Sequence, residues 1–484
     1  MINTFYFLPF LLSLLNPALP EEAKNNVITW PAPAELSPSN YFQVQANGHD
    51  VFVYDAPIAS YSMFDFTGKV DVRIKANRHV SWVDIRPKNL GIHPEFHDST
   101  IWFTLSKPCL LSIELNGESS NQPLFLFAGT PEKDIPDPTD ENVIWFEGGK
   151  IHKPGIIEVK SGQTVYITGG AVVEGIIHAE NASDIKILGR GILDGTLNNE
   201  IRGEQRFRFI HIQNCKNITI KGIILEDSHI WQVVPINCDG VSIKNIKILS
   251  DNGSDDGIDL VRSRNVKVDH CFIRTKDDCI AIKTTYDYPP ETGSENVTVT
   301  NCVFWNAAWG NGLEIGFELR SDFVRNITFK ECDIIHVEDG AVLSIHNGDR
   351  STVQDIRFEN IRIEDAHQKL FDVAIFLSQY SVDRPQNPDE RRIRYLQSAW
   401  DGVLNVTDEN RKYHSQFRGQ IRNIYFKDIY VTDGLFPFSV FHGFDKEHRV
   451  ENVTIENLVV HGRKITSIEE AKIYTEYTEN IMIK

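Results

Sequence analysis

The segments "NVKVDHC" (265–271), "NVTVTNC" (296–302) and "NITFKEC" (326–332) are variants of one short phrase that decides the fold. In each segment apolar residues alternate with polar ones directly after an asparagine, a residue that tolerates the left-handed turn conformation. This pattern predicts a short strand that the chain enters from a turn. The phrase occurs nine times from residue 184 onward, and its first aliphatic residues are Ile185, Ile218, Val241, Val266, Val297, Ile327, Ile356, Ile424 and Val453.

The spacing of the phrase predicts stacked coils. Successive copies begin 23 to 33 residues apart, with a single gap of 68. A propeller blade would need about 40 to 45 residues, so a solenoid of short coils fits better. Equivalent residues of stacked coils share one core environment. The fifth residue after each start should therefore be apolar, and from the second copy onward the column reads Ile223, Ile246, Cys271, Cys302, Cys332, Ile361, Ile429 and Leu458.

We therefore expect an all-β chain whose main part is a right-handed parallel β-helix. The same column explains most of the seven cysteines, because three of them occupy consecutive coils of an apolar ladder. Buried thiols behave as small apolar side chains. We interpret these cysteines as free and buried, and no CxxC spacing indicates a metal site.

The chain divides into three predicted parts. Residues 1–25 contain an apolar stretch of signal-peptide length and predict a secreted or periplasmic protein. Residues 27–136 alternate polar and apolar in short runs and predict an antiparallel β-sandwich domain. Residues 140–484 form the predicted β-helix, and its long gap places an insertion near 365–418, which we interpret as a lid or cleft wall.

Charge and hydropathy exclude several classes of partner. The formal net charge of −18 argues against nucleic acid and against anionic membrane surfaces. The N-terminal apolar stretch is too short to cross a bilayer, and no apolar run of 18 or more residues follows it. We expect a monomer without membrane or nucleic-acid partners.

Three aspartates gather where neighbouring coils are aligned. Stacking "DDGIDL" on "DDCIAIK", "NGLEIG" and "GAVLSIH" places Asp256, Asp278 and Asn311 at equivalent positions, with Asp277 beside Asp278. Crowded carboxyl groups resist ionising together, so the pKa of at least one is raised. One protonated and one ionised carboxyl group are what glycosidic-bond cleavage requires. We interpret Asp255, Asp259 and Asp269 as turn and outward strand positions.

Two other interpretations of the aspartates stay open at this stage. Turn aspartates often cap coil corners, and grouped carboxylates can also bind calcium, as in a pectate-lyase-like β-helix. A lyase would need a basic proton abstractor, and the nearest candidates are Lys283, Arg262 and Arg264. We expect no metal and no cofactor.

The motifs "DGID" (256–259), "DDCIAIK" (277–283) and "GNGLEIG" (310–316) resemble glycoside hydrolase family 28, the polygalacturonase family. The resemblance covers roughly residues 145–350. It implies an inverting hydrolase in which Asp277 is the general acid, while Asp256 and Asp278 hold the attacking water as base.

The sequence departs from the family pattern at three places. Ser254 stands for an Asn, Asn311 for a His, and "SIH" (344–346) for the family's R-I-K, which holds the uronate carboxylate. Serine cannot make that charge-assisted contact, and histidine makes it only when protonated. The chain is also similar to the dextranase and isopullulanase family, glycoside hydrolase family 49, which implies the β-helix, the three aspartates and a preceding β-sandwich, with activity on neutral α-glucans.

Aromatic and polar residues near the aspartates are candidates for sugar contacts. Indole rings stack on the apolar faces of sugars, and Trp305 and Tyr286 lie near the motifs, although any of these rings can equally fill a coil corner. The predicted substrate-binding residues are Asn311, Trp309, Glu314, Lys283, His346, His229 and Trp231.

The leading functional prediction is a secreted inverting glycoside hydrolase that cleaves a polysaccharide or its oligosaccharides. It would be polygalacturonase-like with an altered uronate-binding site. The alternatives are a dextranase-like hydrolase of neutral α-glucan, a non-catalytic carbohydrate-binding β-helix and a pectate-lyase-like enzyme.

Overall fold

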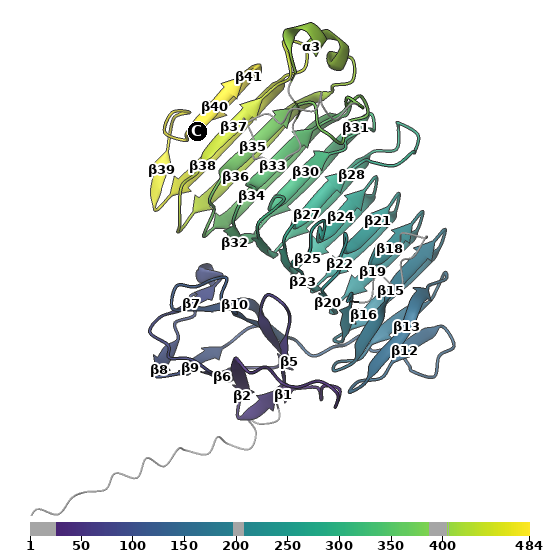
Figure 1. The fold of residues 1–484 in the computed structure, drawn as a ribbon, viewed down its shortest axis with the longest axis vertical. Helices are drawn as coiled ribbons and strands as arrows, with labels where there is room; N and C mark the ends of the chain where they lie inside the picture. Colours follow the sequence, from purple (N-terminus) through teal and green to yellow (C-terminus); the bar gives the residue numbers. More distant parts are fainter. Residues whose placement is uncertain (1–25, 197–207, 387–403, 405) are drawn as a thin grey trace, which may run out of the picture.

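A computed structural model describes residues 26–196, 208–386, 404 and 406–484. The predicted signal peptide and part of the predicted insertion lie outside these residues. Apart from the helix α3 (Asp408–Ser415) and the 3₁₀ turn η1 (Lys88–Leu90), every regular element of the described residues is a β-strand (Figure 1). No helix in these ranges is long and apolar enough to span a membrane.

The N-terminal part is a sandwich of two sheets, each packed on the other through its apolar face. Strand β6, for example, alternates buried and exposed residues over its whole length, which places one side chain in two in the shared core. The first sheet is antiparallel except that β5 and β11 pair in parallel. It contains β1 (Val27–Ile28), β4 (Val53–Asp55), β5 (Ser60–Phe66), β7 (Val83–Arg86), β10 (Cys109–Leu115) and β11 (Leu124–Gly129). The second contains β2 (Phe42–Ala46), β3 (His49–Val51), β6 (Val70–Ala76), β8 (Glu95–His97) and β9 (Thr100–Leu105).

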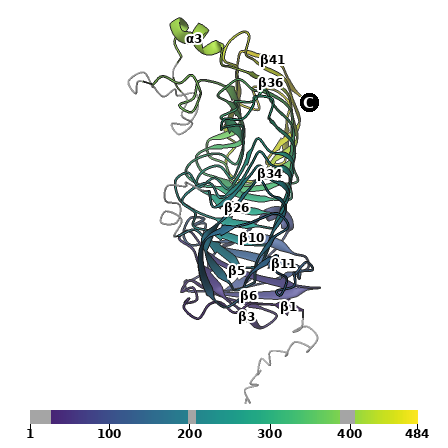
Figure 2. The ribbon, with the colours of Figure 1, turned by 90° about the vertical axis from the view of Figure 1, so that its right-hand side faces the viewer.

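The remaining strands form a right-handed parallel β-helix, as predicted, and its coils stack along the long axis of the molecule (Figure 2). Its strands make three parallel sheets. The repeat sheet carries the recurring phrase and contains β12 (Val143–Phe146), β14 (Thr164–Ile167), β16 (Ser183–Gly189), β19 (Lys216–Lys221), β22 (Asp239–Lys244), β25 (Arg264–Asp269), β28 (Ser294–Thr300), β31 (Phe323–Lys330), β34 (Thr352–Ile363), β36 (Gln420–Val431), β38 (Val450–Val460) and β41 (Thr478–Ile483).

The other two sheets have different neighbours. The covered sheet contains β17 (Ile192–Asp194), β20 (Ile224–Glu226), β23 (Lys247–Leu249), β26 (Phe272–Thr275), β29 (Val303–Asn306) and β32 (Asp333–Val337). The site sheet contains β13 (Ile151–Glu158), β15 (Val172–Glu180), β18 (Ile210–Gln213), β21 (Val233–Ile236), β24 (Ile258–Val261), β27 (Ile280–Lys283), β30 (Leu313–Phe317), β33 (Ala341–Asn347), β35 (Lys369–Ile375), β37 (Phe438–His442) and β40 (Ile473–Glu476). The short β39 (Arg463–Ile465) pairs antiparallel with β38.

The predicted core column is confirmed. All eight residues, from Ile223 to Leu458, are fully buried, and the three cysteines among them are free thiols. Phe329, Phe358 and Phe426 occupy another column and stack with ring centroids 5.0 and 5.1 Å apart. The 68 residues between Ile356 and Ile424 form a single coil, because these two residues pair directly in neighbouring strands. Since β35 is a regular strand of the site sheet, the extra residues lie between Ile375 and Gln420.

The turn asparagines confirm the predicted entry into each strand. Asn265, Asn296 and Asn326 all have φ values between 55° and 57°, in the left-handed region. Each side chain also donates to its neighbour one coil back, with Nδ2 to Oδ1 distances of 3.1 Å (Asn296 to Asn265) and 3.4 Å (Asn326 to Asn296). The phrase therefore supplies both the turn and a polar ladder between coils.

The first sheet of the sandwich packs on the covered sheet (Figure 1). Phe125 contacts Phe272 and Trp305 of the β-helix, with ring centroids 4.9 and 5.8 Å apart. A carboxyl group is enclosed in this interface, because the Tyr61 hydroxyl donates to Glu226 at 2.6 Å. Burial, reinforced by the charges of Asp194 and Asp227, raises the pKa of Glu226 to about 8.

The raised pKa of Glu226 predicts a pH-dependent effect of the substitution Glu226→Gln. Burying Glu226 costs no free energy through its ionisation below the ordinary pKa of 4.5, because the carboxyl is protonated in both the folded and the unfolded state. This cost is largest above pH 8, because the unfolded chain ionises the group freely there. We expect E226Q to raise the free energy of unfolding by roughly 2–4 kcal/mol near pH 8 and to change it little near pH 4. Denaturant unfolding at both pH values, with the exposed E180Q as control, measures this. An equal effect of E226Q at both pH values would contradict it.

Candidate active site

The three predicted aspartates meet in a cleft on the site sheet. Asp256 precedes β24, while Asp277 and Asp278 lie one coil further on and precede β27. One carboxyl oxygen from each residue lies within 4.8 Å of the others. The cleft has a volume of about 500 Å³ and is lined by Trp231, Ser254, Asp256, Asp277, Asp278, Lys283, Trp309, Gly310, Asn311, Phe317, Glu318, Gln379 and Tyr380.

Asp255 anchors the turns that carry the cleft aspartates. Its carboxylate accepts backbone N–H groups of Asn252 at 3.0 Å, Lys276 at 3.1 Å and Asp277 at 2.9 Å. The side chain is fully buried, so it joins the two coils internally. The prediction of a turn position is correct for Asp255, but the residue also fixes the backbone of Asp277.

The coil after Asp278, which contains Asn311, hydrogen-bonds to the Asp278 side chain. Asn311 donates to Asp278 Oδ1 from its backbone N–H at 2.7 Å and from its side-chain amide at 3.2 Å. Gly310 has φ +66°, and a Cβ there would lie 2.4 Å from the Asp278 nitrogen. Only glycine allows these two turns to approach so closely. Asn311 therefore orients an acid, in addition to lining the cleft as predicted.

Burial and mutual repulsion separate the charges of the aspartates. Burial, followed by the charges of Asp256 and Asp255, raises the pKa of Asp277 to about 7. Burial, followed by the charges of Asp277, Asp256 and Glu314, raises the pKa of Asp278 well above its usual range. A protonated acid can therefore persist here near neutral pH.

Lys283 supplies the compensating positive charge. Its Nζ lies 2.7 Å from Asp256 Oδ2 and 3.1 Å from Asp259 Oδ1. Burial opposes the charge on Lys283, yet Asp256 and Asp259 raise the pKa of this ammonium well above its ordinary value. Asp259 is fully buried in this pair, so the prediction of a turn or outward strand position missed its role.

The same ammonium bears on the calcium interpretation. The three carboxyl groups are close enough together to bind a cation. However, the Lys283 ammonium already lies against Asp256, where a bound cation would have to compete with it. The donor set therefore fits carboxyl chemistry better than a metal centre.

Glu314 and His346, two predicted sugar contacts, lie under the cleft instead of in it. Both side chains are fully buried. The His346 Nδ1 is 3.0 Å from Glu314 Oε2, and its Nε2 is 3.0 Å from Asp372 Oδ2. These carboxylates raise the pKa of His346 well above its ordinary value, against the effect of burial. The prediction that Glu314 and His346 contact the sugar is therefore wrong, because the two side chains form an internal ion pair of the site sheet.

The predicted aromatic contacts divide in the same way. Trp231 and Trp309 line the cleft, and each has a lysine ammonium near its ring: Lys283 lies 4.0 Å from the Trp231 centroid and Lys276 lies 4.4 Å from that of Trp309. Trp305 is buried in the sandwich interface.

His229 and Tyr286, the two remaining candidates near the motifs, are not among the lining residues. His229 is half-buried beside Ser228. Tyr286 accepts a hydrogen bond at its hydroxyl from Arg208 at 3.4 Å.

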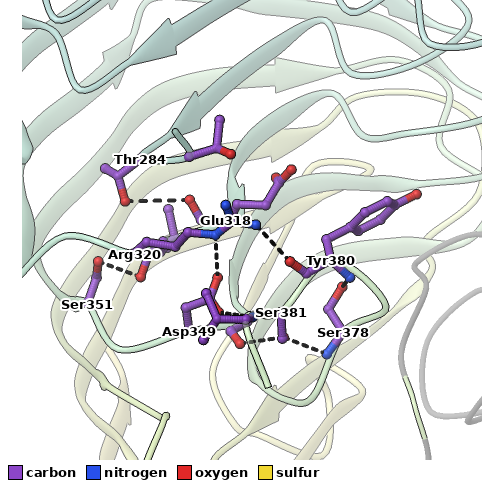
Figure 3. A network of polar contacts seen from close by, with 12 residues as sticks. Thr284, Glu318, Arg320, Asp349, Ser351, Ser378, Tyr380 and Ser381 are labelled. Carbon is purple, nitrogen blue, oxygen red and sulfur yellow. Dashed lines mark hydrogen bonds and ion pairs between the residues drawn. The ribbon is translucent and has the colours of Figure 1, made fainter. Parts of the chain in front are cut away.

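Six lining residues were not predicted as site residues: Ser254, Gly310, Phe317, Glu318, Gln379 and Tyr380. The last two belong to the wall segment, residues 376–386, which lies within the predicted insertion (365–418) and directly follows β35. Figure 3 shows how this segment is held: Arg320 donates to the Tyr380 carbonyl at 3.0 Å and its Nε lies 3.8 Å from Asp349 Oδ2. The aromatic composition of the insertion was a signal for a cleft wall, but no repeat register reaches these residues.

Comparison with known proteins agrees with this geometry. The model of "Glycosyl hydrolases family 28" matches residues 149–376. This central segment resembles glycoside hydrolase family 28. It includes all three aspartates, and so the resemblance predicted from the motifs is confirmed.

Individual relatives are similar over part of their length. A polygalacturonase of Juniperus ashei is 26% identical over 212 residues, 40% of each chain. An endo-polygalacturonase of Pectobacterium carotovorum is 25% identical over 207 residues, 42% of this chain and 49% of its own. The matches thus span less than half the length of these relatives.

Solved structures show the same fold. Dex49A from Penicillium minioluteum aligns over 95% of this chain and 98% of its own, with a TM-score of 0.57 and 14% identity. A hyperthermoactive exopolygalacturonase from Thermotoga maritima aligns over 71% of this chain and 83% of its own, with a TM-score of 0.51 and 18% identity. At these identities the likeness concerns the fold alone.

Proposed function

We propose that this protein hydrolyses glycosidic bonds in a polysaccharide or its oligosaccharides. The observation that carries the proposal is the meeting of three carboxyl groups in one cleft, with Asp277 half-buried at its surface and the pKa of Asp277 raised to about 7. Asp277 gives its proton to the glycosidic oxygen as the bond to the leaving sugar breaks. Asp256 and Asp278 hold a water, whose oxygen bonds to the anomeric carbon while its proton passes to a carboxylate.

Inversion of the anomeric centre is supported by the resemblance to family 28. The distance between the carboxyl groups does not by itself indicate inversion. The carboxyl oxygens lie within 4.8 Å of one another, which is closer than the roughly 6.5–9.5 Å common in inverting enzymes. The apolar N-terminal segment supports secretion or a periplasmic location. We propose that the protein acts there as a monomer.

The charges of the cleft support an altered uronate-binding site. Four of its lining residues are acidic: Asp256, Asp277, Asp278 and Glu318. Lys283 is the sole cation among the lining residues that the structure describes, and it is engaged by Asp256 and Asp259. His346, at the place of the family's lysine, is buried between two carboxylates. A uronate carboxylate would find no unengaged cation among the described lining residues, because Lys276 and Arg208 lie outside the lining, against the rings of Trp309 and Trp231. We therefore propose a glycan without a uronate at the cleaved bond.

Removing the proton donor tests the activity itself. We expect Asp277→Asn to lower kcat by about 10²–10⁴-fold, because an amide cannot deliver the proton. The fold should persist, since Asn keeps the size of the side chain. A reducing-sugar screen of neutral and acidic glycans, with proton NMR of the first anomer released, measures the activity. D269N, which changes a partly exposed aspartate of the repeat sheet, is the control, and full turnover by D277N would refute the assignment.

The raised pKa of Asp277 predicts the alkaline side of the rate profile. The acid must carry its proton in the free enzyme, so kcat/KM should fall as the pH rises through about 7. An ordinary aspartate, with a pKa of 3.8, would already have lost the proton far below that pH. Initial rates between pH 4 and pH 9 measure this. A rate that stays constant up to pH 9 would contradict the role of Asp277.

Substrate charge tests the altered uronate site. We expect neutral α-glucans such as dextran or pullulan to be cleaved at least about tenfold faster than homogalacturonan, because an unpaired uronate loses a charge-assisted bond of about 1.5–3 kcal/mol. Fully methyl-esterified galacturonan, which lacks the charge but keeps the sugar, is the matched control. A clear preference for unesterified homogalacturonan would refute the proposal that the cleaved bond carries no uronate.

A further inference from the structure

We propose that Lys283 is a positioning residue that keeps Asp256 as the ionised member of the three cleft aspartates, and that Asp259 in turn holds Lys283. This inference rests on the proposed function. It assigns to Lys283 a role different from the substrate contact that the sequence predicted.

The geometry fixes the ammonium on three sides. Lys283 ends β27, and Asp259 lies in the neighbouring strand β24 of the same sheet, where it pairs with Ala281. The Lys283 Nζ is 2.7 Å from Asp256, 3.1 Å from Asp259 and 4.0 Å from the centre of the Trp231 ring. Its side chain is only 7% exposed. The ammonium donates a hydrogen bond to Asp256 Oδ2, while Asp259 and the face of the Trp231 ring add electrostatic contacts to its charge.

Asp259 shows why the arrangement is specific. Neither of its carboxyl oxygens has a hydrogen-bond partner among the described residues, and the side chain is fully buried. Its ion pair with Lys283 therefore provides the compensation that such a buried group needs. Without a fixed cation in this place, the sheet would gain nothing from a carboxyl group here.

Selecting one carboxylate from three has a chemical purpose. A hydrolytic site needs one ionised base and one protonated acid, and three crowded carboxyl groups could share their protons in several ways. A cation in contact with Asp256 alone among the three favours the form in which Asp256 is ionised. Its negative charge then favours the protonated forms of Asp277 and Asp278. Lys283 thereby distributes the roles of base and acid.

Other charged groups also face this cluster. They belong to three parts of the chain and contribute in both directions: Asp255, Asp259, Glu314, Glu318 and Arg208. The contact with Lys283 at 2.7 Å is the direct ion pair of Asp256.

Kinetics of Lys283→Met against pH test the proposal. We expect kcat at pH 5 to fall at least about tenfold, KM to change less than about threefold, and the acidic limb of kcat/KM to move up by about one pH unit or more. K283R keeps the charge and should restore part of the rate and the position of the limb. K247M is the matched control, since Lys247 is an equally buried lysine of the covered sheet, outside the cleft. The free energy of unfolding of K247M should differ from that of the wild type, whereas the acidic limb of its kcat/KM profile should stay in place.

The outcomes separate three roles of Lys283. A rise in KM with unchanged kcat would show a substrate contact and overturn the proposal. A loss of stability in K283M with an unmoved acidic limb would show a merely structural ion pair and overturn it as well. A moved limb with rescue by K283R supports the positioning role.

An infrared titration of carboxyl groups keeps the test independent of turnover. At neutral pH, the difference spectrum of K283M against the wild type should show added protonated-carboxyl intensity, and the double variant D256N/K283M should lose that addition again. Absence of this gain would overturn the role of Lys283, whatever the activity. A wild type that hydrolyses none of the glycans, together with the added intensity in K283M, would instead refute the proposed function and leave the ion pair as described.

Discussion

The register between successive coils is the constraint on which the rest of this structure depends. Parallel pairing places equivalent residues of neighbouring coils about 4.8 Å apart, although they are 22 to 33 residues apart in the sequence. The buried column of Ile246, Cys271 and Cys302 and the group of cleft aspartates are both products of this one spacing. A slip of one residue would turn the core outward and separate Asp256 from Asp278.

The same register forces charges together, and the site sheet balances them pair by pair. Asp259 and Lys283 lie under one end of the cleft, while Glu314, His346 and Asp372 continue the row further along. Burying a charge is costly unless an opposite charge stands beside it. The serine and histidine at positions 344 and 346 are consistent with this balance, since His346 is a cation between two carboxylates and Ser344 donates to Glu314. The departure from the family motif thus concerns the interior of the sheet as much as its surface.

The sandwich contributes to the molecule through packing, at a distance from the carboxyl chemistry. It covers the sheet next to the site sheet and buries apolar residues of β17, β20, β23, β26, β29 and β32 that would otherwise face solvent. A parallel β-helix sheet that faces water with Phe272 and Trp305 would be an aggregation hazard. The interface explains why Trp305, an attractive candidate for sugar stacking in the sequence, is unavailable for it.

The sequence by itself determined the coils, because a period repeated nine times allows each copy to test the others. It determined Asp256, Asp277 and Asp278 as neighbours for the same reason, since the second strands of the coils align without gaps. It could not determine that Glu314 and His346 are buried. Alternation along a strand predicts which face of the sheet a side chain occupies, but not whether other parts of the chain cover that face. Only the tertiary structure decided that Lys283 belongs to Asp256 and Asp259, and that Gln379 and Tyr380 form a wall of the cleft. Gln379 and Tyr380 lie outside the repeat, where no internal register constrains them. Lys283 lies within the repeat, but the direction of its side chain depends on packing against Trp231 and on its two aspartates.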